Sequence, residues 1–360
     1  MKISPLKCLS PAMVCGSLVM IASAALAHDT IPLGDGNISA APQRGYLFSC
    51  QQSFNPNAPG AVKSGSWIKG GTWSPSGKPD VDGKIGWPGS RIDISLKGGA
   101  RIISANNLPD HPTGSFPVAR SDDAYQFDRN PNTIREQRIL LRLPAVPAVA
   151  AEPSCVPMGM IGFALSGAAI FNAVDAKGQD APAHEIQDAC NGHPERNGQY
   201  HYHNLSPCLP DKGREEQRHS DLVGYALDGF GIFGINGVGG QPLHNADLDA
   251  CHGHVHEVSW NGETRNIYHY HYTDEYPYAV GCFMGTPAKL ENARGASGEQ
   301  GAQPANGRAI LRRAAQILGV SERQLADAVG APPPDFRKAS RVLGISQGTI
   351  KAAFDTARGQ

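Results

Sequence analysis

The feature that most constrains this chain is a block of sequence that occurs twice. The tetrapeptide Tyr-His-Tyr-His stands at residues 200–203 and again at residues 268–271. Each copy follows the pattern Asp-Ala-Cys-x-Gly-His, which runs from Asp188 to His193 and from Asp249 to His254. Histidine is the commonest protein ligand for transition metals. Each block therefore predicts a group of three metal-binding imidazoles.

The repeated unit is larger than the tetrapeptide. The stretch Gly-Phe-Ala-Leu-Ser-Gly-Ala-Ala-Ile-Phe at 162–171 matches Gly-Tyr-Ala-Leu-Asp-Gly-Phe-Gly-Ile-Phe at 224–233. Matching blocks in the same order indicate a tandem duplication, with copies at about 157–215 and 219–283. Two copies are too few for a solenoid, so we expect a pseudo-symmetric pair of β units that share one core.

The spacing of the histidines suits a β-hairpin. Residues two apart on a strand face the same side, and an Asn-Gly turn such as Asn197-Gly198 can bring the preceding histidine back beside them. The predicted metal ligands are His193, His201, His203, His254, His269 and His271. His252 and His256 flank His254 and are secondary candidates. Neutral imidazoles suit Zn²⁺ or Cu²⁺, and each copy could hold its own ion or all six rings could converge on one.

Other interpretations of these residues stay open at this stage. Buried histidines often do no more than bond to neighbouring carbonyls. Asp228 replaces Ser166 between the matching blocks; it is a candidate general base or orienting group, or it caps a turn. Asp188 and Asp249 are expected to form turns.

The first 27 residues have the pattern of a secretory signal peptide. Two lysines precede an apolar run from about Met13 to Ala25, and Ala25-Leu26-Ala27 fits the small-x-small cleavage rule. The run is too short to cross a bilayer, and no later segment is long and apolar enough to do so. We therefore expect a secreted or periplasmic protein without a membrane span.

Six cysteines follow the signal, and an exported chain with an even number of cysteines is expected to form disulfides. Each repeat has one cysteine before and one after its Tyr-His-Tyr-His. This arrangement predicts the pairs Cys190–Cys208 and Cys251–Cys282, which leaves Cys50–Cys155. The alternative is that Cys190 and Cys251 bind metal as thiolates.

The regions around the repeat are predicted from composition and local pattern. Residues 28–150 are expected to contain short strands between turns, for example at 65–68, 91–96 and 138–143. The whole chain has 42 Gly and 28 Pro, a composition that indicates a turn-rich β protein. Residues 144–153 are interpreted as a linker between this region and the duplicated domain at 151–285. A net charge of −1 gives no electrostatic reason to expect nucleic acid as a partner.

A helical tail is predicted at the C-terminal end, after a Gly- and Ala-rich linker at 286–304. Two similar stretches within 305–360 each carry a Gly that can end a helix and a Ser that can begin the next, at Gly319 to Ser321 and at Gly344 to Ser346. Pro332-Pro333-Pro334 divides them. We expect a small appendage that docks or contacts a protein partner.

These motifs resemble the YHYH-domain family of exported proteins. The residues that carry the resemblance are Gly192-His193 with 200–203, the same block from Gly253 to His271, and the segment 228–231. Trp87-Pro88 and residues 128–131 are also typical, so the likeness covers about 100–285. The resemblance implies export and metal binding and assigns no reaction.

Two classes of function fit the pattern. One is a metal-dependent enzyme outside the cytoplasm, hydrolytic with zinc or oxidative with copper, with Asp228 or Glu257 as the nearby acid. The other is a binding module that holds metal for structure, storage or surface interaction. Neither Gly-x-Ser-x-Gly nor His-Glu-x-x-His occurs in the chain, and their absence favours the binding module or an unfamiliar chemistry. The substrate of an enzyme does not follow from these residues.

Overall fold

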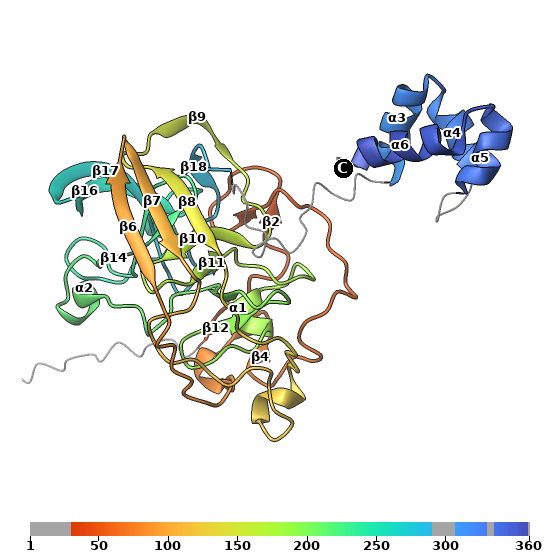
Figure 1. Cartoon of the computed structure of the whole chain (residues 1–360). Helices are drawn as coiled ribbons and strands as arrows, with labels where there is room; N and C mark the ends of the chain where they lie inside the picture. The colour runs from red at the N-terminus through yellow and green to blue at the C-terminus, as the bar shows by residue number, and fades with distance from the viewer. Residues whose placement is uncertain (1–29, 290–306, 330–334, 359–360) are drawn as a thin grey trace, which may run out of the picture.

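The structure is a computed structural model that describes residues 30–289, 307–329 and 335–358 (Figure 1). Residues 30–289 are mainly β, and the remaining described residues form four helices, as predicted. The signal segment, residues 290–304 of the predicted linker and Pro332-Pro333-Pro334 lie outside the described residues. Within the described ranges, no helix combines the length and the apolar character needed to cross a bilayer.

An eight-stranded sheet forms the centre of the β part. Its order is β12-β13-β11-β10-β14-β15-β17-β16. The strands are β10 (Met160–Ala164), β11 (Ala169–Phe171), β12 (Gly192–Pro194), β13 (Tyr200–Tyr202), β14 (Leu222–Ala226), β15 (Gly231–Phe233), β16 (Gly253–Trp260) and β17 (Glu263–His271). The two segments that carry the repeated motif, β12–β13 and β16–β17, therefore lie at opposite edges of one sheet.

The strand order is symmetric about the seam between β10 and β14. Gly162 pairs with Ala226 and Ala164 pairs with Gly224 in antiparallel register. A Cβ at Gly162 would lie 2.8 Å from the carbonyl oxygen of Tyr225, and a Cβ at Gly224 would lie 2.8 Å from that of Phe163. Both glycines are thus required by close backbone approach at equivalent points. Two β units that share one core would show this symmetry. The duplication of the sequence itself stays a prediction.

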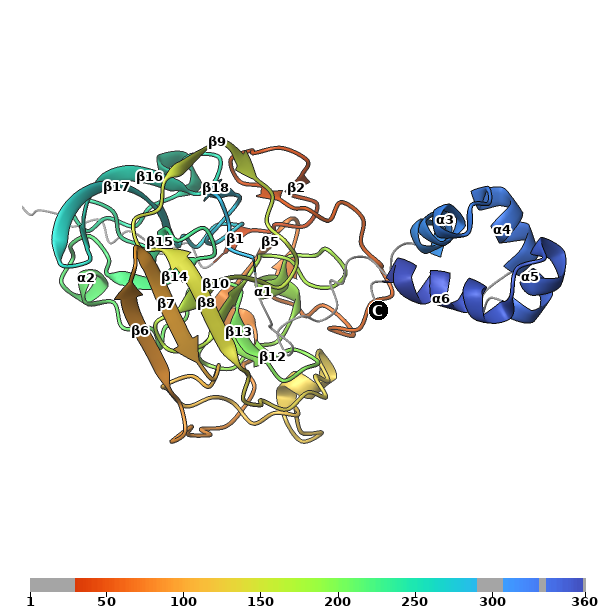
Figure 2. The ribbon, with the colours of Figure 1, turned by 45° about the horizontal axis from the view of Figure 1, so that its top comes forward.

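A second sheet of three antiparallel strands, β6 (Ile92–Lys97), β7 (Ala100–Ala105) and β8 (Ile139–Pro144), packs against the central one (Figure 2). The guanidinium of Arg101 on β7 lies 4.0 Å from the ring centre of Tyr225 and donates to Asn261 Oδ1 at 2.7 Å. The predicted strands at 91–96 and 138–143 are thus confirmed, whereas that at 65–68 reaches only the start of β4.

The predicted linker at 144–153 is wrong. Residues Val149–Ser154 form β9, which pairs with β18 (Phe283–Gly285). The Ala- and Val-rich composition suggested a loose connection, but the backbone there is extended and hydrogen-bonded to a distant segment. The N-terminal region and the repeat are also joined by one continuous hydrophobic core, which includes Leu47, Ile103, Phe163 and Tyr270.

The N-terminal segments wrap around the repeat in short pieces. They are β1 (Ile31–Pro32), β2 (Ile38–Ser39), β3 (Leu47–Phe48), β4 (Ile68–Lys69), β5 (Thr72–Trp73) and the 3₁₀ turns η1 (Pro75–Gly77) and η2 (Asp123–Gln126). Three short helical pieces lie within the repeat: α1 (Ala181–His184), α2 (Lys212–Glu215) and η3 (Asn245–Asp247). The Trp67 indole, for example, donates to the carbonyl of Ala183 in α1 at 2.9 Å.

The six cysteines form the three predicted pairs, Cys50–Cys155, Cys190–Cys208 and Cys251–Cys282. The first ties the N-terminal region to the strand that leads into the repeat. The other two each enclose one histidine motif. Because the sulfurs of Cys190 and Cys251 are bonded to other cysteines, the alternative in which they bind metal as thiolates is not supported.

The four tail helices are α3 (Gly307–Leu318), α4 (Glu322–Val329), α5 (Phe336–Leu343) and α6 (Gln347–Arg358). Their own core includes Ala314, Leu325, Ile350 and Phe354. The predicted caps are present. Ser321 Oγ accepts from the amide of Gln324 at 3.2 Å, and Ser346 Oγ accepts from that of Thr349 at 3.1 Å. The glycines before them, at 319 and 344, have positive φ values of 67° and 68°.

Candidate metal sites

Two antiparallel hairpins bring the histidines of each motif together. In the first, His193 on β12 lies directly across from His201 on β13. In the second, His254 on β16 lies directly across from His269 on β17. The second hairpin turns through Asn261-Gly262, where both residues have positive φ, as a two-residue hairpin loop requires. The local sequence therefore produces the same juxtaposition twice.

The two histidines of the first Tyr-His-Tyr-His have their ring orientation set by backbone carbonyls. His201 Nδ1 lies 3.1 Å from the carbonyl oxygen of Gln199, and His203 Nδ1 lies 2.5 Å from that of Asn172. A carbonyl can only accept, so each Nδ1 carries the hydrogen and each Nε2 of the neutral ring presents a lone pair. The Nε2 atoms nevertheless lie 3.1 Å apart.

The second motif uses the corresponding carbonyls. His269 Nδ1 lies 2.9 Å from the carbonyl oxygen of Ile267, and His271 Nδ1 lies 2.6 Å from that of Gly234. In both motifs the first ring thus bonds to the residue two positions earlier. The second ring bonds to the residue that follows Phe171 or Phe233. Both motifs therefore aim Nε2 lone pairs inward, and an imidazole whose other nitrogen is held in this way is typical of metal ligands.

His193, His201 and His203 form what we call the three-histidine cluster. All three side chains are buried, and their ligand nitrogens lie within 4.8 Å of one another. A carboxylate that sequence reasoning missed completes the group. Glu185 Oε2 lies 3.4 Å from His193 Nε2 and 3.3 Å from His203 Nε2. Donor atoms bound to one tetrahedral Zn²⁺ lie roughly 3.4 Å apart, because each bond is about 2.0–2.1 Å long.

Glu185 is positioned by its neighbours rather than by the repeated motif. It follows the four-residue helix α1, which begins after Asp180. The Asp180 carboxylate is buried and accepts from the amide of Gly34 at 2.7 Å and from the hydroxyl of Tyr278 at 2.8 Å. These contacts come from segments far away in the sequence, so the local pattern gave no sign that Glu185 faces the histidines.

The protonation states in this cluster are those that a cation needs. Burial alone would raise the pKa of Glu185, but the facing His193 and His203 lower it to about 2. Burial lowers the pKa of His193 to about 4, although Glu185 opposes the shift. Burial also holds the pKa of His201 well below its usual range. At neutral pH the cluster therefore offers the neutral imidazoles of His193 and His201 and one carboxylate.

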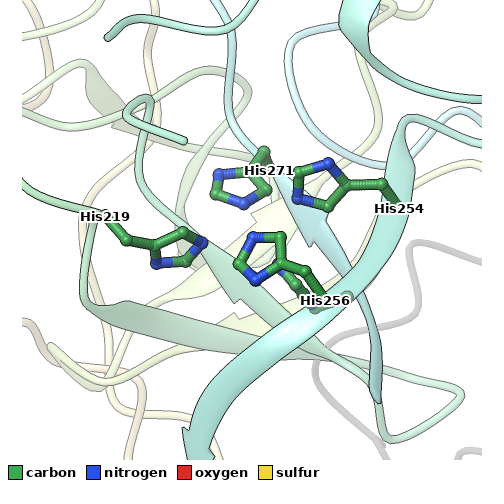
Figure 3. Close-up of side chains that lie close together, drawn as sticks. His219, His254, His256 and His271 are labelled. Atoms are coloured by element: carbon green, nitrogen blue, oxygen red, sulfur yellow. The ribbon is translucent and has the colours of Figure 1, made fainter. Parts of the chain in front are cut away.

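The second group is larger and contains no carboxylate. His219, His254, His256, His269 and His271 form the five-histidine cluster, whose ligand nitrogens lie within 4.8 Å of one another. Figure 3 shows the rings of His219, His254, His256 and His271 turned toward a common space. All five Nε2 atoms are buried and find no hydrogen-bond partner among the described residues. Burial lowers the pKa of His254 to about 4 and that of His269 to about 3.

His219 was missed by the sequence analysis. It stands outside the motif, between α2 and β14, and its Nδ1 lies 2.7 Å from the carbonyl oxygen of Ser220. Its ring centre is 4.5 Å from that of His256 and 4.9 Å from that of His271. Its position could have indicated this role, because the histidine lies just before the second matching block at 224–233. The first copy has no histidine at the equivalent place, so the repeat did not draw attention to it.

Of the two secondary candidates, His256 joins the five-histidine cluster and His252 does not. The Nδ1 of His252 lies 2.9 Å from the carbonyl oxygen of His271, and its Nε2 lies 3.1 Å from Thr273 Oγ1. The physical reason is the backbone: His252 has a φ of 75° and precedes the start of β16 at Gly253. The two-residue alternation that carries His254 and His256 therefore does not extend back to it.

The candidate acids Asp228 and Glu257 are not placed among the histidines. Asp228 is buried on the tyrosine face of the sheet, where it accepts from the hydroxyl of Tyr270 at 2.6 Å and the amide of Gly285 at 2.9 Å. It also accepts from the amide of Phe230 at 3.2 Å, so its contacts are those of a turn cap. Glu257 is exposed. Asp188 and Asp249 form turns as predicted, each accepting from the amide of the following cysteine.

The residues of both clusters fit a transition metal ion. Lone pairs on neutral imidazoles repel one another, and a buried acceptor without a donor is costly. A cation at the centre of each group would satisfy these nitrogens at once.

The six predicted ligands do not converge on one point. Four strands lie between β13 and β17, which separates them by roughly 24 Å at about 4.8 Å per strand.

Comparison with known proteins identifies one family. The model of the family described as YHYH protein matches residues 140–241. This range contains the first Tyr-His-Tyr-His and ends before the second, and it is shorter than the 100–285 expected from the motifs. Neither a curated protein nor a solved structure matches the chain.

Proposed function

We propose that this chain, which carries a domain of the YHYH family, is an exported protein that binds a transition metal ion at each of its two histidine clusters. The ligands at the three-histidine cluster are His193, His201, His203 and Glu185. Those at the five-histidine cluster are His219, His254, His256, His269 and His271. Zn²⁺ and Cu²⁺ are the ions that suit donor sets of this kind.

One observation supports this proposal above the others. In both clusters the Nδ1 atoms of the two Tyr-His-Tyr-His histidines face backbone carbonyls, so their Nε2 lone pairs point into a buried space. Histidines that served only to bond carbonyls would have no reason to bring their second nitrogens within 4.8 Å of one another. The same pattern appears in two hairpins whose surroundings differ.

The disulfides and the signal-like N-terminus support export. Disulfides persist in oxidising compartments and are rare in the cytosol. Fractionation of cells that express the chain should recover it outside the cytoplasm, shortened by about the predicted signal, with its cysteines resistant to alkylation until a reductant is added. Recovery of a full-length, reduced chain from the cytoplasm would contradict this part of the proposal.

Metal content of the purified protein tests the main proposal. Elemental analysis of the wild type is compared with the variants His201→Ala/His203→Ala and His269→Ala/His271→Ala. We expect each double variant to lose the ion of its own cluster and to keep the other. His244→Ala is the matched control, because the His244 side chain is 64% exposed and stands in neither cluster.

Folding must be checked in parallel, because the four histidines are buried. Circular dichroism and alkylation of free thiols show whether each variant retains its sheet and its disulfides. The milder His201→Gln and His269→Gln variants keep a polar side chain of similar size. Wild-type protein that remains metal-free after exposure to Zn²⁺ and Cu²⁺ would overturn the proposal, as would folded double variants with full metal content.

A further inference from the structure

The two clusters differ in three respects that bear on how an ion is held. We propose that the three-histidine cluster with Glu185 is a closed, structural zinc centre, whereas the five-histidine cluster is an exchangeable copper site. This inference rests on the proposed function and adds to it which ion each cluster prefers and which one leaves. It concerns the retention of the ions and assigns no reaction.

The first difference is the donor set. Three imidazoles and one carboxylate make four donors, the number that tetrahedral Zn²⁺ takes in structural sites. Three of the six separations between these donors, at 3.1 Å, 3.3 Å and 3.4 Å, are close to the edge length of such a tetrahedron. The carboxylate also offsets part of the charge of a divalent ion in a buried place, where an unbalanced charge is costly.

The five-histidine cluster offers nitrogen alone. Affinity of nitrogen sites for divalent ions follows an order in which Cu²⁺ stands above Zn²⁺. Five donors also exceed the four that a tetrahedral ion uses, whereas Cu²⁺ accepts tetragonal arrangements. A set of five imidazoles without a carboxylate or a thiolate therefore favours copper over zinc more strongly than the three-histidine cluster does.

The second difference is access. His193, His201 and His203 are each at most 4% exposed, and the Glu185 side chain is 14% exposed. In the five-histidine cluster, His269 and His271 are buried, but His219, His254 and His256 are partly exposed. The cluster therefore has an inner pair of buried ligands and an outer set of three whose rings are partly exposed, although their Nε2 atoms are buried.

The third difference is the kind of segment that carries the outer ligands. His254 and His256 lie on β16, the strand at the edge of the central sheet. His219 lies on the loop after α2, next to the exposed Arg218. Two acids, Asp211 and Asp247, lie close enough to act on the charge of His219 and His254. An incoming cation would thus meet these two acids, with Arg218 as an opposing charge near His219, and the partly exposed imidazoles before it reaches the inner pair.

A spare ligand provides a route for exchange. With five imidazoles, an ion can change one outer ligand for an incoming chelator while four nitrogens still hold it. In the three-histidine cluster, any departing ion must break contact with one of four buried donors, and none is in excess. The structure therefore leads us to expect fast exchange at one cluster and slow exchange at the other.

The experiment measures exchange on the full chain. Protein stripped with a chelator is loaded with Zn²⁺, and excess Zn²⁺ is removed. Cu²⁺ is then added together with a chromogenic zinc indicator, and release of Zn²⁺ is followed in time. We expect a fast phase in which half of the bound zinc is released and a slow phase for the remainder. Electron paramagnetic resonance of the bound Cu²⁺ should show coupling to several nitrogens.

Variants assign the two phases. In Glu185→Gln the slow phase should be lost, because the closed cluster no longer retains its ion, while the copper spectrum stays unchanged. In His219→Ala four imidazoles remain, so copper should still bind, but the fast phase should be lost because the spare ligand is gone. His244→Ala, as the exposed control, should leave both phases as they are in the wild type.

Failure of this inference can be distinguished from failure of the proposed function. A chain that takes up neither ion would overturn both. Release of all the zinc in a single phase, or a fast phase that survives in folded His219→Ala, would overturn only the claim that the two clusters differ in exchange. Copper that enters the three-histidine cluster first, shown by a spectrum that changes in Glu185→Gln, would reverse the assignment of the ions.

Discussion

Glu185 Oε2 lies 3.3 Å from His203 Nε2, at a point where the repeated motif supplies no acid. Replacement of this carboxylate by an amide in Glu185→Gln keeps the size of the side chain and removes its charge. We expect zinc affinity at the three-histidine cluster to fall at least about tenfold, since even the loss of an outer-shell partner costs that much. Competition with a chelator of known affinity measures the change.

Glu257→Gln is the matched control for this substitution. Glu257 is the same kind of residue, is exposed and lies on β16. It should leave the metal affinity of both clusters unchanged. An equal loss of affinity in the two variants would show that Glu185 acts through general charge and not as a ligand.

The disulfide Cys190–Cys208 joins two residues 18 positions apart and closes a loop that contains all three histidines of the first cluster. In Cys190→Ser/Cys208→Ser the unfolded chain regains the freedom of that loop, which should lower the free energy of unfolding by roughly 3 kcal/mol. Urea unfolding in the presence of a chelator measures this cost without the contribution of bound metal.

The same substitution should weaken metal binding in one cluster only. The ligands of the three-histidine cluster would have to be ordered by the ion itself, whereas the five-histidine cluster keeps its own disulfide, Cys251–Cys282. Cys251→Ser/Cys282→Ser serves as the comparison and should show the reverse pattern. Unaltered zinc affinity in both double variants would mean that the hairpins hold their histidines without help from the disulfides.

Tyr270 and Tyr202 occupy equivalent places but have different partners. The Tyr270 hydroxyl donates to the Asp228 carboxylate at 2.6 Å and accepts from the amide of Met284 at 2.8 Å. The Tyr202 hydroxyl bonds with Ser166 Oγ at 3.0 Å and with His111 Nε2 at 2.5 Å, and neither partner is a carboxylate. Because hydrogen bonds to charged groups are the stronger ones, Tyr270→Phe should cost about 2–3 kcal/mol of unfolding free energy and Tyr202→Phe about 1–2 kcal/mol.

Thermal or urea unfolding of the two metal-free variants checks this order. Since both hydroxyls lie on the face opposite the histidines, neither substitution should change the number of bound ions. A larger cost for Tyr202→Phe would contradict the prediction. It would mean that Asp228, which stands where the first repeat has Ser166, does not give its tyrosine the more stabilising hydrogen bond.

Asp180 gives the stability of the protein a defined dependence on pH. Burial raises the pKa of this carboxyl to about 6, against an unperturbed value of 3.8. The folded state therefore holds the proton more tightly than the unfolded state. The proton on Asp180 therefore contributes up to roughly 3 kcal/mol to the free energy of unfolding. This contribution is complete below about pH 4 and is lost as the pH rises through about 6.

Asp180→Asn should remove this dependence. Its amide oxygen can accept from Gly34 and its amide nitrogen can donate to Tyr278, so the buried contacts are retained without a charge. Relative to the wild type, the variant should become more stable as the pH rises from 4 to 7. Urea unfolding at both pH values, with a chelator present throughout, measures the difference, and a gap between the two proteins that does not change with pH would contradict the prediction.

Local sequence was sufficient wherever neighbouring residues set the geometry. The alternation in Tyr-His-Tyr-His placed His201 and His203 on one face, and the Asn-Gly turns placed His193 and His254 across from their partners. Aspartates before each cysteine formed turns, and serines after glycines capped the tail helices. Each of these outcomes depends on contacts between residues no more than about 15 positions apart, which a short pattern can encode.

The members that complete each cluster could not be found in this way. Glu185 is oriented by α1, which is anchored by Gly34, Trp67 and Tyr278 from distant segments. His219, which precedes β14, reaches the second cluster only because a single strand, β15, separates β14 from β17 in the sheet. The exclusion of His252 depends on one positive φ angle. Side-chain type and spacing carry no information about such long-range contacts.

The sequence by itself thus determined that each repeat makes a hairpin lined with imidazoles and enclosed by a disulfide, because hairpin register and turn type are local properties. Only the tertiary structure decided that the two groups lie at opposite edges of one sheet. It also decided that one group is completed by a buried carboxylate and the other by two further histidines. The physical reason is that strand order and the packing of distant segments determine which side chains meet.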